Sequence, residues 1–184
     1  MQIVLSVPTK EDVEKARQWR NEVLETLRTP FPLTKEMQED FYHNVICNRQ
    51  APSRFWAVQR VWDEKHLAGK TEAKFQTVGL VGLVGIEWEN RLAEISMMIN
   101  PSEKGKGYGT KALGLLLAKG FRELNLENIY GECYTCNPAI CFWKKMIARY
   151  SILSYSTTLP NRKFWDGKYW DGLYFNFERG KVDV

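Results

Sequence analysis

One glycine-rich run constrains the fold of this chain more than any other feature: Lys104-Gly105-Lys106-Gly107-Tyr108-Gly109-Thr110. It follows the apolar stretch 93–100, which Pro101 closes, and it leads into a helical pattern over residues 111–124. Glycine has no Cβ, so alternate glycines let the backbone turn several amide N–H groups towards one point. A following helix adds its own unpaired N–H groups and the positive end of its dipole. The run therefore predicts a strand–loop–helix unit that binds a phosphate-bearing ligand.

The spacing of the glycines excludes two common phosphate-binding loops. A Walker A loop ends in Gly-Lys-Ser/Thr, whereas Gly109 is followed by Thr110 and Lys111 in the reverse order. A dinucleotide-binding loop needs two residues between its second and third glycines, and here only Tyr108 separates Gly107 from Gly109. Neither of these loops fits the sequence.

The pattern that does fit is a basic residue or Gln, two residues, Gly, one residue, then Gly or Ala, between a strand and a helix. On this pattern the chain resembles the GCN5-related N-acetyltransferase (GNAT) superfamily, with Lys104 in the place usually held by Arg or Gln. The resemblance extends over nearly the whole chain. Its further parts are the fourth strand (97–99), the third helix (113–124), the fifth strand (129–134), the start of the fourth helix (137–139), and two runs, 17–21 and 166–171, that resemble one branch of the family. That branch acetylates ribosomal-protein N-termini, polyamines and nucleotide-linked amino sugars.

The resemblance implies one α/β domain over residues 1–184. Its fold would be a mixed, mostly antiparallel sheet of six or seven strands, flanked by about four helices, with strands four and five splayed apart. It also implies acetyl-coenzyme A as co-substrate, a primary amine as acceptor, direct attack in a ternary complex, and no metal. The residues expected to contact the cofactor are Met97, Met98, Ile99, Lys104, Gly105, Lys106, Gly107, Tyr108, Gly109, Thr110, Asn137 and Lys144. A backbone N–H of Met98 or Ile99 would donate to the thioester oxygen.

The general base is expected on or beside the fourth strand. Residues alternate in a strand, so Glu94, Ser96 and Met98 face one way and Ala93, Ile95 and Met97 the other. Glu94 is the first candidate and Glu87, at the end of the third strand, is the second. Glu94 could instead form an ordinary ion pair with Arg91 or a neighbouring strand, and a water chain could replace a dedicated base.

The general acid departs from the family pattern. Many members carry a Tyr in the fourth helix that protonates the departing thiolate, and Trp143 stands at that place. An indole N–H donates a hydrogen bond but is no usable acid. Tyr134, Cys141 or water could substitute, or the thiolate could leave unprotonated. This departure supports an alternative class, a non-catalytic acyl-coenzyme A-binding sensor or interaction module, and transfer of another acyl group also stays open.

Two further runs could have a functional role, but the sequence favours a structural role for each. Cys133 and Cys136 have CxxC spacing, but no second pair accompanies them, so core thiols are favoured over a metal site. Residues 160–169 are expected as an aromatic, basic loop between the last two strands, with a turn at Asp166-Gly167. Its aromatic rings are expected to pack across strands rather than to cover the acceptor. Residues 63–74, polar and containing Gly69, are expected as a hairpin loop or a flexible excursion.

Composition limits the partners and the location that can be expected for this chain. The chain has 184 residues, 44% of them apolar, and a net charge of +4. Its basic residues form no stripe, so no nucleic-acid partner is expected. No apolar run is long enough to span a membrane, and the N-terminus lacks the features of a signal peptide, so a cytoplasmic location is expected. A homodimer is expected only from the family, and the acceptor is not identified.

Overall fold

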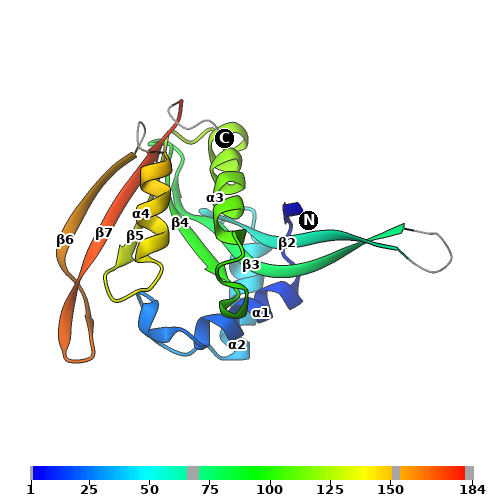
Figure 1. Cartoon of the computed structure of the whole chain (residues 1–184), viewed down its shortest axis with the longest axis horizontal. Coiled ribbons are helices and arrows are strands. Elements are labelled where there is room, and N and C mark those ends of the chain that lie inside the picture. The colour runs from blue at the N-terminus through cyan, green and yellow to red at the C-terminus, as the bar shows by residue number, and fades with distance from the viewer. Residues whose placement is uncertain (1, 66–70, 151–153, 181–184) are drawn as a thin grey trace.

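The computed structural model describes residues 2–65, 71–150 and 154–180 (Figure 1). Its strands are β1 (Gln2–Ser6), β2 (Ser53–Lys65), β3 (Thr71–Glu87), β4 (Leu92–Ile99), β5 (Asn128–Tyr134), β6 (Ser154–Trp165) and β7 (Lys168–Glu178). Its α-helices are α1 (Lys10–Asn21), α2 (Lys35–Phe41), α3 (Tyr108–Ala118) and α4 (Ile140–Arg149). Single turns of other helix types lie at η1 (Leu24–Thr26), η2 (Tyr42–Ile46), η3 (Pro101–Glu103) and η4 (Lys119–Glu123). Within the described part of the chain, no helix has the length and apolarity needed to cross a membrane.

The seven strands form one mixed sheet in the order β1-β2-β3-β4-β5-β7-β6. Only β4 and β5 run parallel, and the other neighbours are antiparallel, so the expected sheet is confirmed. The register of β4 and β5 covers only Leu92–Glu94 against Asn128–Tyr130. Beyond Glu94 the two strands separate, which leaves the rest of β4 paired on its β3 side alone. This is the splay that the resemblance implies.

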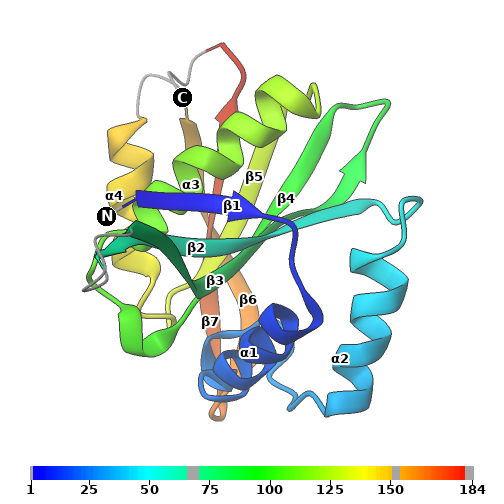
Figure 2. The same cartoon turned by 90° about the vertical axis from the view of Figure 1, so that its right-hand side faces the viewer.

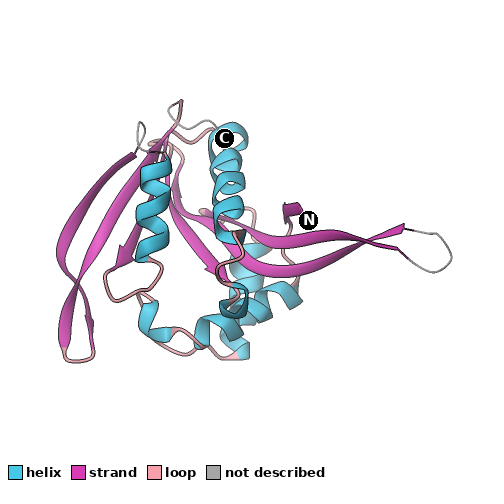
Figure 3. Cartoon of the chain, viewed as in Figure 1, coloured by secondary structure: helices cyan, strands magenta, loops and turns pink. Residues whose placement is uncertain are grey.

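Helices cover both faces of the sheet (Figures 2 and 3). On one face α3 and α4 pack against Ala93, Ile95, Met97 and Ile99 of β4, and these side chains belong to the main core. On the other face α1 packs its Ala16 and Trp19 against Leu80 of β3 and Met98 of β4. The predicted alternation along β4 is therefore correct.

Local sequence signals fix the start of α1. The Thr9 hydroxyl accepts a hydrogen bond from the Asp12 amide at 3.2 Å, and the Asp12 carboxylate accepts one from the Thr9 amide at 2.8 Å. This reciprocal pair is a capping box. The same carboxylate also accepts from the Thr77 hydroxyl of β3, so the cap ties α1 to the sheet.

Two segments expected as loops are largely strands. β2 continues to Lys65 and β3 begins at Thr71, so much of 63–74 forms a long hairpin arm, visible in Figure 1, and residues 66–70 lie outside the described residues. Likewise β6 runs on to Trp165 and β7 begins at Lys168, which reduces the expected 160–169 loop to a turn at Asp166-Gly167. Phe164 and Tyr169 are register partners with ring centroids 5.2 Å apart. Such cross-strand aromatic contacts stabilise paired strands, and they explain why this segment stays extended.

Candidate active site

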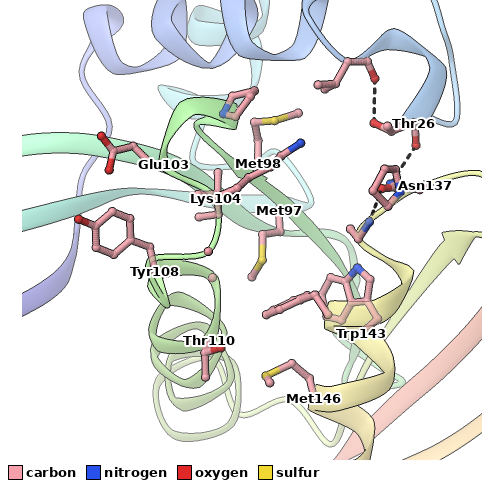
Figure 4. A pocket seen from close by; sticks show the side chains of 18 of the residues that line it. Thr26, Met97, Met98, Glu103, Lys104, Tyr108, Thr110, Asn137, Trp143 and Met146 are labelled. Atoms are coloured by element: carbon pink, nitrogen blue, oxygen red, sulfur yellow. Dashed lines mark hydrogen bonds between the residues drawn. The ribbon is translucent and has the colours of Figure 1, made fainter.

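A cavity of about 500 Å³ lies between the end of β4, the N-terminus of α3 and the first turns of α4 (Figure 4). Its walls come from three segments that are distant in sequence, namely 23–27, 97–110 and 137–146. The lining residues are Val23, Thr26, Leu27, Met97, Met98, Ile99, Pro101, Glu103, Lys104, Gly105, Gly107, Tyr108, Gly109, Thr110, Asn137, Pro138, Ala139, Phe142, Trp143, Lys145 and Met146.

The glycine-rich loop forms the polar end of this cavity. Gly105 and Gly107 have φ values of 81° and 79°, the left-handed region that favours glycine, and a Cβ at either position would lie in open space. Gly107 is the N-cap of α3, so the amides of Gly109 and Thr110, in the first turn, have no acceptor within the helix. At Gly109 a Cβ would stand 3.4 Å from the Phe142 ring, at van der Waals contact, so the start of α3 lies close to α4. The loop thus offers free N–H donors at the positive end of a helix dipole, which suits an anion.

Ten of the twelve predicted cofactor residues line the cavity, and Lys106 and Lys144 do not. The Lys106 ammonium pairs instead with the Glu103 carboxylate at 2.8 Å. Lys144 is exposed on α4, and its neighbour Lys145 lines the cavity in its place. The binding roles of all twelve stay predictions.

The segment 23–27 is a wall that the sequence does not reveal. Val23, Thr26 and Leu27 line the cavity. The side-chain amide of Asn137 holds this wall, because it donates to the Thr26 carbonyl at 3.2 Å while its oxygen accepts from the Ala139 amide at 2.8 Å (Figure 4). Asn137 thereby joins segment 23–27 to the start of α4.

A buried lysine holds the same segment from the other side. Lys163 of β6 is 5% exposed, and its ammonium donates to the carbonyl of Glu25. The rings of Tyr134 and Trp165 lie 5.5 and 5.3 Å from this ammonium. Burial lowers the pKa of Lys163, because the charged form loses its hydration.

The two candidate bases occupy different places. Glu94 forms a two-point ion pair with Arg28, whose Nη1 donates to Oε2 at 3.1 Å while Nη2 donates to Oε1. Its expected partner, Arg91, pairs with Glu127 instead. Glu87 is exposed beside the β3–β4 turn, where its carboxylate accepts from Asn90 at 2.7 Å. Neither Glu87 nor Glu94 lines the cavity.

The Arg28–Glu94 pair is part of a larger group on the sheet face opposite α3 and α4. Arg28 Nη2 also lies 3.8 Å from Glu132 Oε2, and Arg162 Nε donates to Glu132 Oε1 at 2.8 Å. We call Arg28, Glu94, Glu132 and Arg162 the arginine–glutamate cluster. The hydrogen bonds that Arg28 donates to Glu94 raise the pKa of Arg28, and those that Arg162 donates to Glu132 raise the pKa of Arg162. Sequence separations of 66 and 30 residues hide these pairs from sequence patterns.

Trp143 occupies the place where the family pattern expects a tyrosine. Its side chain is buried and stacks on Phe175, with ring centroids 4.5 Å apart, so it acts as a core residue that also borders the cavity. Tyr134 is the phenol beside the cluster, and its hydroxyl accepts from Arg28 Nε at 3.3 Å.

Cys133 and Cys136 have the environment of core or near-core thiols, whereas Cys47 and Cys141 are exposed. Cys133 is buried, and burial raises its pKa to about 12, whereas Cys136 is half-buried. Over the described ranges, no three His, Cys, Asp or Glu side chains come together in a metal-binding group.

A family model for the acetyltransferase (GNAT) domain matches residues 2–141 of the sequence. The chain belongs to the GNAT family. Among curated relatives, the spermidine N(1)-acetyltransferase of Escherichia coli (strain K12) is 37% identical over 109 residues, which cover 52% of this chain and 59% of that protein. The enzyme of the same name from Vibrio cholerae serotype O1 is 31% identical over 113 residues, 53% of this chain and 65% of that protein. The matched region therefore spans less than two thirds of the length of either relative.

Solved structures confirm the GNAT fold. The spermidine N-acetyltransferase from Vibrio cholerae in complex with CoA and spermine superimposes with a TM-score of 0.75, over 98% of this chain and 97% of that one. Sequence identity in that superposition is 21%, so the likeness concerns the fold alone.

Proposed function

We propose that this chain is an acetyl-coenzyme A-dependent N-acetyltransferase that acts on a primary amine by direct attack in a ternary complex. One observation carries the proposal: the unpaired edge of β4 beyond Glu94 and the free amides of the glycine-rich loop open into the same cavity. A phosphate-bearing thioester of extended shape needs both features. The loop amides would bind its anionic end, and the β4 edge would pair with its amide-containing arm.

The residues present fit coenzyme A. The loop from Lys104 to Thr110 would hold its pyrophosphate, and the Lys104 ammonium forms no ion pair with any described residue. The backbone of Met97 to Ile99 would pair with the pantetheine amides, and an N–H of Met98 or Ile99 would bind the thioester oxygen. When bound, the cofactor supplies the activated acetyl group. The backbone donor stabilises the charge that develops on the oxygen, which is typically worth about 3–4 kcal/mol.

Glu94 is the base that we propose. Glu94 lies four positions before Met98, about 13 Å along a strand, so it would take the proton of the amine through water rather than directly. Its two-point ion pair with Arg28 fixes the position of this carboxylate. The position of Glu87 gives that residue no support. For the acid, Tyr134 shares the hydrogen-bond network of Arg28 and Glu94, and we propose it as the source of a proton for the thiolate.

Calorimetry with coenzyme A, followed by thiol release from acetyl-coenzyme A with a panel of amines, tests the proposal. The panel contains spermidine, because the matched relatives bear that name, together with amino sugars, aminoglycosides and peptides with a free N-terminus. Binding with thiol release on one class supports the enzyme and identifies its acceptor. Binding without release on any amine would favour the sensor module, and no binding would refute the assignment of the loop.

A pair of variants separates the candidate bases. Glu94→Gln is expected to lower kcat by about 100-fold or more and to remove the acid limb of the pH profile of kcat/KM. Glu87→Gln serves as its matched comparison, since it makes the same chemical change on the neighbouring strand. If Glu87→Gln has the larger effect, Glu94 is not the base. Gel filtration would test the homodimer, which stays a prediction.

A further inference from the structure

The charges of the arginine–glutamate cluster are arranged in two layers. The side chains of Glu94 and Glu132 are 18% and 8% exposed, whereas those of Arg28 and Arg162 are 56% and 49% exposed. The carboxylates therefore lie on the strands, and the guanidinium groups cover them. A molecule that approaches this face of the sheet meets the cations first.

The two guanidinium groups flank a single carboxylate and retain donors for a ligand. Both reach Glu132, Arg28 to Oε2 at 3.8 Å and Arg162 to Oε1 at 2.8 Å. A guanidinium has five N–H donors. Arg28 donates three of them, to Glu94 and Tyr134, and Arg162 donates two, to Glu132. Each side chain thus keeps at least two N–H groups beyond those donated in these hydrogen bonds, and about half of each side chain is exposed.

The sequence makes room for this arrangement. Gly172 of β7 lies beside the Glu132–Arg162 pair, and a Cβ there would stand 2.4 Å from Glu132 Oε1 and 3.0 Å from Arg162 Cγ. Any other residue would push the carboxylate or the arginine stem out of place. The glycine therefore fits the geometry in which Arg162 lies flat over Glu132.

Two tyrosines extend the cluster into a mixed polar and aromatic surface. Tyr130 is the register partner of Glu94 across β4 and β5, and Tyr174 is the partner of Glu132 across β5 and β7. Their rings stack with centroids 5.7 Å apart. Burial, and then the charge of Glu94, raise the pKa of both phenols, which remain neutral donors at physiological pH. The surface combines two exposed guanidinium groups, two neutral phenols and an aromatic stack.

We propose that the acceptor amine of this enzyme carries an anionic group, a carboxylate or a phosphate, which Arg28 and Arg162 bind together. Planar guanidinium groups with free N–H pairs match both of these anions. A polyamine fits this surface less well, because an ammonium group placed here would have to displace an arginine from Glu94 or Glu132. This inference rests on the proposed function and specifies the acceptor class for it.

Matched pairs of amines test the inference. Glucosamine 6-phosphate against glucosamine gives the phosphate arm, β-alanine against β-alanine amide gives the carboxylate arm, and spermidine gives the cationic arm. We expect kcat/KM to be at least about tenfold higher for the anionic member of one pair than for its neutral partner, through a lower KM. The arm that shows the preference distinguishes phosphate from carboxylate.

Variants connect that preference to the two arginines. In Arg28→Gln and Arg162→Gln, the ratio of kcat/KM for the anionic amine to that for its neutral partner is expected to fall by about 10- to 100-fold. Arg122→Gln, an exposed arginine in η4 away from this surface, is the control and should keep the ratio. Coenzyme A affinity and the melting temperature, measured for each variant, show that it is folded.

Three results would overturn the inference. Preferred turnover of spermidine, with a further rise in kcat/KM for it in Arg28→Gln, would mean that the carboxylates bind a cation and that Arg28 only occupies their place. Equal use of the anionic and neutral members would remove any role for the arginines in recognition. Intact coenzyme A binding without turnover of any amine would refute the proposed function itself and this inference with it.

Discussion

Replacing Gly107 tests the phosphate site most directly, because this position separates backbone strain from charge. Gly107 caps α3 with φ at +79°, and a Cβ built there meets no heavy atom within 4 Å. Gly107→Ala, Gly107→Lys and Gly107→Glu therefore share one backbone penalty and place different side chains in the same open space before the free amides of α3.

The shared penalty can be estimated. An L-residue in the left-handed region costs about 1–2 kcal/mol, which lowers the melting temperature of a chain of this size by about 2–8 °C. All three variants should show this loss to a similar extent. A much larger loss in one of them would mean that its side chain disturbs the fold, and its binding data would then have to be set aside.

The charge effect should separate the variants. A carboxylate about 6 Å from a phosphate charge repels it by about 0.7–3 kcal/mol, for effective dielectric constants between roughly 80 and 20. With two phosphate charges in the pyrophosphate, Gly107→Glu should bind coenzyme A at least about tenfold more weakly than Gly107→Ala. Gly107→Lys carries the opposite charge and should bind no more weakly than Gly107→Ala.

Calorimetry with coenzyme A and with pantetheine, which has no phosphate, checks this reasoning. The order of affinities should hold for coenzyme A and disappear for pantetheine. If Gly107→Glu and Gly107→Ala bind coenzyme A equally well, the pyrophosphate does not lie at this loop, and the assignment of the cavity fails.

Two other predictions concern buried charges. Asp12→Ala removes the acceptor of hydrogen bonds from Thr9 and Thr77, which should lower the free energy of unfolding by about 3 kcal/mol and the melting temperature by about 6–12 °C. Glu11→Ala, on the exposed side of the same turn, should change the stability little. Equal losses in the two variants would contradict a special role for the cap. Burial lowers the pKa of Lys163 in the folded chain below its ordinary 10.5, so the unfolded chain binds the lysine proton more tightly. The contribution of Lys163 to the free energy of unfolding therefore rises with pH up to about 10.5, and it is lost as the pH falls through the pKa of the folded state. Between pH 7 and pH 9.5, the urea midpoint of the wild type should therefore rise relative to that of Lys163→Met. If the difference between the two midpoints is the same at both pH values, Lys163 has no such pKa shift.

Much of the fold follows from local patterns in the sequence. The cap of α1 needs only Thr9 and Asp12, three residues apart, and the faces of β4 follow from strict alternation. The loop before α3 is also local, since its glycines stand next to the helix that they cap. These local patterns predict the observed structure correctly because no contact with a residue distant in sequence opposes them.

The lengths of the hairpins could not be predicted in this way. The stretch from Asp63 is polar, and only its pairing with Ala73 and Glu72 across the hairpin shows it to be a strand. The same holds for Arg162 and Lys163, whose charges suggest a loop. In β6 the charge of Arg162 is matched by Glu132, and that of Lys163 by the Glu25 carbonyl. A polar strand is stabilised by partners that its own sequence does not contain.

The segment 23–28 connects the two halves of the candidate site. Val23, Thr26 and Leu27 line the cofactor cavity, and the next residue, Arg28, crosses to Glu94 and Glu132 on the opposite face of the sheet. Asn137 and Lys163 hold this short segment through consecutive carbonyls, those of Thr26 and Glu25, so it has little freedom to adjust one end without the other. An anion that draws the Arg28 side chain outward would therefore also change the wall against which coenzyme A packs. Such a linkage is reciprocal, and coenzyme A should change the affinity for the acceptor by the same factor as the acceptor changes the affinity for coenzyme A.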